Sequence, residues 1–159
     1  MTAVQFLFPE NRLAKLIRRP GGVSYAQAMA AAEANMDSIR ADVLAGVDEN
    51  LQRIDQLSAD PAVAFSPEIQ AELYERSNYV AGLAGSGGLP ELGQAAFCYC
   101  ELLDRIIAGA AWPQAAVTVH MDSLKLLRAM GVASPENDRA AIVEGLRKVA
   151  ERVIRPAAE

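Results

Sequence analysis

The chain has 159 residues, 52% of them hydrophobic and 22% charged, and its net charge is −5. This length and composition predict a helical domain with a core of its own and exclude a disordered chain. The acidic balance argues against a nucleic acid as partner, and no apolar run reaches the roughly 18 residues that a membrane-spanning helix needs.

Residues 1–22 are predicted to form an N-terminal segment with one short helix. The piece 11–19 is amphipathic, and the Pro-Gly-Gly at 20–22 ends it. A helical domain is predicted over 23–159, beginning with a long helix that Ser24 caps and that reaches about Leu57. Apolar residues recur along this helix at threes and fours, the pattern of an amphipathic helix: Met29, Met36, Ile39, Val43, Val47, Leu51 and Ile54.

Four further helices are predicted after a linker over 58–65. The first spans about 66–87, because Ser66-Pro67-Glu68 combines a capping hydroxyl, a proline at the first helical position and an acid at the positive end of the helix dipole. The others span about 88–109, 112–131 and 134–154, with proline near each start. No alternating strand pattern is present, so we expect an all-α antiparallel bundle with short loops.

Asn78 is expected to point into solvent from the helix over 66–87. At 100° per residue, the apolar residues of this helix cluster on the side opposite Asn78 and should pack inward: Ile69, Leu73, Val80, Leu83 and Ala84. The residues beside Asn78 on the outer side are Ala71, Tyr74, Glu75, Gly82 and Gly85. Since a helical glycine costs about 1 kcal/mol relative to alanine, exposed glycines here favour close approach of a partner. The alternative is an Ala/Gly-rich helix that packs on a neighbouring helix.

The stretch Asn78–Leu92 resembles the active-site segment of histidine phosphotransfer (Hpt) domains, written His-x-Leu-Lys-Gly-x-Ala-x-x-x-Gly-Leu-x-x-Leu. The matching positions, without a gap, are Val80, Gly82, Ala84, Gly88, Leu89 and Leu92. Asn78 stands where the family has its phosphorylated histidine, and Ala81 stands where it has a lysine. An amide nitrogen is not a usable phosphoryl acceptor, and alanine offers no cation to neutralise a phosphoryl group.

The Hpt resemblance implies a four-helix bundle built from the helices over about 66–87, 88–109 and 112–131 and one flanking helix. It also implies binding to response-regulator receiver domains without carrying phosphate, as a competitor, sink or adaptor, with a histidine kinase as a further candidate partner. The docking residues that it implies are Ala71, Tyr74, Glu75, Asn78, Ala81, Gly82, Gly85 and Ser86.

The whole chain is similar to the small chemotaxis-cluster proteins of alphaproteobacteria labelled CheE. The similar stretches are Asn11–Ile17, Arg19–Gly22, Ala81–Gly85 and Leu146–Ala150. This resemblance implies a role in chemotaxis signalling.

Glu75 and Asn78 also suggest an enzyme. Positions three apart share a helix face, and Glu-x-x-Asn resembles the residues with which several phosphatases attack the aspartyl phosphate of a receiver. The fuller pattern has Asp or Ser four residues before the glutamate, where this chain has Ala71. A third hypothesis is a scaffold protein whose Gly-rich face packs on a second copy, forming a homodimer.

His120 is the one histidine of the chain. It falls near the middle of the apolar face of its helix, so we expect a buried histidine held by a hydrogen bond. No metal site or cofactor is expected. Cys98 and Cys100 lie two apart on a helix and cannot pair with each other. Together with the absence of a signal-peptide pattern, this predicts a cytoplasmic protein.

Overall fold

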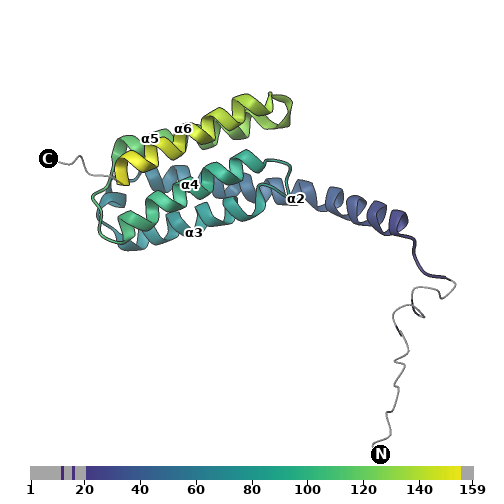
Figure 1. Ribbon diagram of the computed structural model, residues 1–159. Coiled ribbons are helices and arrows are strands. Elements are labelled where there is room, and N and C mark those ends of the chain that lie inside the picture. Colours follow the sequence, from purple (N-terminus) through teal and green to yellow (C-terminus); the bar gives the residue numbers. More distant parts are fainter. Residues whose placement is uncertain (1–11, 13–15, 17–20, 155–159) are drawn as a thin grey trace, which may run out of the picture. The chain divides into compact units, whose positions relative to one another are not determined.

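The computed structural model describes residues 12, 16 and 21–154. These residues form helices joined by turns and loops, with no strand among them, which confirms the expected all-α class for the described part of the chain. The helices, labelled in Figure 1, are α2 (Tyr25–Ala59), α3 (Pro67–Leu83), α4 (Pro90–Ile107), α5 (Gln114–Met130) and α6 (Glu136–Ile154). Two 3-10 turns, Pro61–Ala64 and Gly131–Ala133, complete the order. Among the described helices, none has the length and apolar character needed to cross a membrane.

The chain divides into two compact units, Met1–Met36 and Asp37–Glu159. In the first unit, the predicted helix over 11–19 lies outside the described residues except for Arg12 and Leu16, which are both helical and exposed. Ser24 caps α2 as predicted: its hydroxyl accepts from the Gln27 N–H at 3.2 Å, and the Gln27 side chain accepts from the Ser24 N–H at 3.0 Å.

The long apolar pattern of α2 is buried only toward the C-terminal end of the helix. Val47 and Ile54 are fully buried, whereas Met29, Met36 and Ile39 are exposed. Periodicity identifies one face of a helix, but the packing partner of that face must come from elsewhere in the fold.

Helix α3 begins as predicted and ends earlier than predicted. The Ser66 hydroxyl accepts from the Ile69 N–H at 3.3 Å, and Pro67 is at the start of the helix. The helix ends at Leu83, four residues before the predicted end. The chain then turns at Gly88, whose φ of 85° strongly favours glycine, and the Leu89 N–H donates to the Ala84 carbonyl at 2.8 Å. Helix α4 therefore begins at Pro90 rather than near residue 88.

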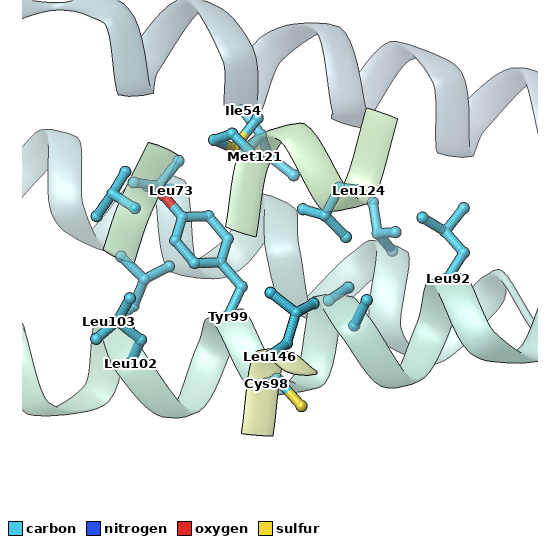
Figure 2. Close-up of a cluster of buried hydrophobic side chains, with 14 of the residues drawn as sticks. Ile54, Leu73, Leu92, Cys98, Tyr99, Leu102, Leu103, Met121, Leu124 and Leu146 are labelled. Atoms are coloured by element: carbon cyan, nitrogen blue, oxygen red, sulfur yellow. The ribbon is translucent and has the colours of Figure 1, made fainter. Parts of the chain in front are cut away.

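The core of the second unit is built around α4, which contacts α3, α5 and α6. Tyr99 of α4 is fully buried, and Figure 2 shows its ring among apolar side chains of the surrounding helices. Its hydroxyl lies 3.2 Å from the Ser58 hydroxyl, and its ring stacks on His120 with 5.6 Å between centroids. The other side chains of this buried cluster that Figure 2 labels are Ile54, Leu73, Leu92, Cys98, Leu102, Leu103, Met121, Leu124 and Leu146.

Ion pairs connect α2 with α3 and with α5. Arg53 of α2 pairs with Glu72 of α3 at 2.8 Å. Lys125 of α5 pairs with Asp55 of α2 at 2.6 Å. Both pairs are largely exposed to solvent and contribute little stability. They show which helices lie next to each other.

Candidate functional site

The outer face of α3 carries residues that were predicted from the sequence to be exposed there. Asn78, Glu75, Ala71 and Gly82 are exposed on α3, and Gly85 is exposed just after it. The opposite side faces the core, as predicted, with Leu73, Val80 and Ala84 fully buried and with Ile69 and Leu83 half-buried against the core. Two glycines and an alanine thus lie beside an exposed amide and an exposed carboxylate.

The two glycines leave open space above the backbone. A Cβ atom built on Gly82 or on Gly85 would meet no heavy atom within 4 Å. Gly82 is the penultimate residue of α3, so it is still helical, and glycine is a weaker helix former than alanine. Gly85 lies beyond the last residue of α3, so the sequence-based view of it as a helical glycine is wrong. Of these two glycines, only Gly82 is therefore an exposed helical glycine.

Three other predicted docking residues are half-buried: Tyr74, Ala81 and Ser86. Tyr74 and Ala81 pack against the core, and the Ser86 hydroxyl donates to the Leu83 carbonyl at 2.8 Å. They lie at the edge of the exposed face and contribute less surface to it than Asn78 or Gly82.

Glu75 and Asn78 make no hydrogen bond or ion pair with the described residues, whereas their charged neighbours are engaged. Arg76 lies 3.7 Å from Glu72 and donates to the Asn50 side chain of α2 at 3.4 Å. The cation nearest to the face is therefore directed toward α2. A carboxylate and an amide remain available for an outside partner.

A groove of about 620 Å³ begins at the glycines and runs between α3, α4 and α6. Phe97, with 57% of its surface exposed, and Gln94 line its α4 side, and Arg147 lines its α6 side. Helices α3 and α4 come close at Gly93, since a Cβ atom there would lie 3.1 Å from the Ala81 carbonyl oxygen. Sequence reasoning missed this groove because its lining comes from three helices and because Phe97 has the apolar character of a buried residue. The signal in the sequence that could have indicated the groove is the aromatic Phe97 together with the glycines Gly82, Gly85 and Gly93, which also line it.

His120 is fully buried, as predicted. Its Nδ1 lies 2.7 Å from the Ala116 carbonyl oxygen, and its Nε2 is buried without a hydrogen-bond partner among the described residues. Burial lowers the pKa of this imidazole, and the Ala116 carbonyl partly opposes that shift. The ring is therefore neutral near pH 7 and closed to a phosphoryl donor.

The cysteines are equally inaccessible. Cys98 and Cys100 are free and buried, and burial raises the pKa of the Cys100 thiol to about 12. Among the described residues, no group of His, Cys, Asp and Glu side chains is arranged to hold a metal ion.

Comparison of the chain with protein-family models, with curated proteins and with solved structures gave no match. Any assignment of function therefore depends on the residues themselves.

Proposed function

We propose that this protein is a phosphate-incompetent, Hpt-like protein that binds receiver domains through the α3 face, in chemotaxis or another two-component pathway. The face is defined by Ala71, Glu75, Asn78, Gly82 and Gly85. In this proposal α3, α4 and α5 form a four-helix bundle together with one of the flanking helices, α2 or α6.

The observation that carries the proposal is the open space above Gly82, on the same face as Glu75 and Asn78. Gly145 of α6 is equally open, so the argument depends on this position beside Glu75 and Asn78, where a glycine lets the backbone or side chains of a partner come close. Asn78 lies on the same face, where the Hpt pattern has its histidine. Because the chain's only histidine is buried elsewhere, the proposed role is binding and not relay of phosphate.

Binding of purified receiver domains from the same cell, with and without a phosphoryl analogue such as beryllofluoride, tests the proposal. Gly82→Arg fills the open space with a long side chain and should weaken binding about 30-fold or more, equivalent to at least about 2 kcal/mol. Titration calorimetry gives the affinity, and circular dichroism gives the helix content.

Gly145→Arg is the matched control. Gly145 is a helical, exposed glycine on α6, and a Cβ there also meets no heavy atom within 4 Å. It does not line the groove. Both variants should keep the wild-type helix content, and Gly145→Arg should keep the wild-type affinity. The proposal fails if no receiver binds the wild type, or if Gly82→Arg is folded and binds as tightly as the wild type.

The second candidate is a receiver phosphatase, favoured by one observation: Glu75 and Asn78 are both exposed and lie three residues apart on one helix face. In this mechanism Glu75 would engage the receiver's lysine, and the Asn78 amide would orient the water that attacks the aspartyl phosphate. The exposed Ala71 departs from the fuller motif, so we expect the wild type to leave receiver dephosphorylation unchanged.

The loss of phosphate from a phosphorylated receiver, followed over time, separates the two candidates. If the wild type accelerated this loss and Asn78→Ala reduced the acceleration at least about tenfold at unchanged affinity, the phosphatase would be the better assignment. A pure binder has no acceleration to lose.

A further inference from the structure

One part of helix α2 is mostly apolar, and yet each of its residues is exposed. All described residues from Gly21 to Met36 are exposed. Tyr25–Met36 contains six alanines and one charged residue, Glu33, among its twelve residues. A helix that is apolar on most of its surface is normally buried. This part of α2 therefore requires a cover.

Four of its residues form a seam with coiled-coil spacing: Tyr25, Met29, Ala32 and Met36. The steps of four, three and four residues place them on one side of the helix. Tyr25 is 81% exposed, Met29 43% and Met36 45%. The three large side chains of the seam thus leave about half or more of their surface in water.

We propose that this seam binds the same seam of a second copy of the chain, with the two helices antiparallel. Antiparallel pairing about a two-fold axis places Met29 opposite the partner's Ala32, so that a large side chain meets a small one. The same register places Tyr25 opposite the partner's Met36, where a thioether packs against an aromatic ring. A parallel pair would instead oppose Ala32 to the partner's Ala32 and leave a gap.

The charges agree with a second copy as the occupant. Next to the antiparallel seam, Glu33 lies beside the partner's Ala26, so no like charges meet. Selection of a foreign partner usually depends on charged or polar groups that reject other partners. The seam residues carry no charge, while their sizes complement one another.

The contact is short. Twelve helical residues span about 18 Å, which provides less than the roughly 1,200 Å² that a stable interface buries. The association is therefore weak and reversible, and it depends on protein concentration.

Sedimentation velocity of the full chain, from about 1 μM to about 1 mM, tests the proposal. The wild type should shift from monomer to dimer within this range. Met29→Lys places a charge in the seam and should raise the dissociation constant about tenfold or more. Ala34→Lys, which puts the same charge on the opposite side of the helix, should leave the constant unchanged. A wild type that stays monomeric at the highest concentration overturns the proposal. So does an equal change of the dissociation constant in Met29→Lys and Ala34→Lys.

Disulfide trapping tests the orientation. A mixture of Tyr25→Cys chains and Met36→Cys chains, oxidised mildly, should form mostly the mixed disulfide, because the antiparallel register brings these two positions together. The native cysteines are buried and are common to both variants. Disulfides only between identical chains would indicate a parallel pair and contradict the proposed register.

Discussion

At the scale of single residues, His120 is a buried titratable group inside the described core. It is fully buried between the Ala116 carbonyl and the ring of Tyr99, and its Nε2 has no hydrogen-bond partner among the described residues. A proton added to Nε2 would create a charge that the surrounding apolar side chains do not stabilise. The residue thus stabilises the fold only while it is neutral.

The stability of the protein should therefore decrease as the pH falls below about 6.5, the pKa of an unperturbed histidine. Burial lowers the pKa of His120 in the folded state. Between the folded and unfolded pKa values the unfolded chain binds more protons, so the free energy of unfolding rises with pH. The contribution of His120 to the free energy of unfolding is complete above the pKa of the unfolded state and is lost as the pH falls through the pKa of the folded state. In urea unfolding between pH 5 and 7, the free energy of unfolding should rise with pH, and the part due to His120 has a slope of at most about 1.4 kcal/mol per pH unit.

His120→Phe is the matched variant, since phenylalanine keeps a ring against Tyr99 but does not titrate. The variant should lose most of the slope between pH 5 and 7, whatever its overall stability. An unchanged slope would assign the pH dependence to other groups.

At the scale of elements, the Glu91–Arg139 pair ties the beginning of α4 to α6. The Arg139 Nε lies 3.0 Å from a Glu91 carboxylate oxygen, and the two side chains are only 12% and 10% exposed. Arg139 also donates to the carbonyls of Gly131 and Ser134, so it fixes the connection between α5 and α6. Arg139 lowers the pKa of Glu91, chiefly through the hydrogen bond.

Removing Arg139 should destabilise the protein by about 3 kcal/mol, because it leaves a largely buried carboxylate without its partner. Arg139→Leu tests this by chemical unfolding. Lys148→Leu, which breaks the exposed pair with Glu144 on α6, should cost less than about 0.5 kcal/mol. Similar losses in the two variants would show that the Glu91–Arg139 pair is no stronger than a surface pair.

The starts of α2 and α3 could be predicted from local residues, but the surroundings of these helices could not. Ser24 and Ser66 cap their helices through bonds to residues three positions away, so a short stretch of sequence contains the whole signal. Likewise, the 3.6-residue period was enough to predict the orientation of Asn78. Met29 and Phe97 have the same apolar character as buried residues, and their exposure depends on which helix covers them. The groove beside Gly82 was missed for the same reason, because it requires three helices at once.

At the scale of the whole molecule, buried side chains are unevenly distributed. Along the described chain, the first buried residue is Val47, and the buried cluster belongs to the second unit. Regions with few buried contacts open at a low free energy, whereas core helices exchange their amide hydrogens only through global unfolding. Residues 21–36 of the first unit and the core of the second unit should therefore differ widely in local stability.

Hydrogen exchange measured by mass spectrometry should reveal this difference. In dilute protein, below the concentration at which copies associate, the amides of Tyr25–Met36 should exchange within seconds to minutes. The amides of α4, which includes the fully buried Leu92, Tyr99, Leu102 and Leu103, should remain protected for as long as the protein stays folded. At high concentration, self-association should slow exchange in Tyr25–Met36 and leave α4 unchanged, and Met29→Lys should remove this dependence. Strong protection of Tyr25–Met36 in dilute Met29→Lys protein would mean that a cover within the same chain stabilises this helix, and the exposed seam would then lose its role.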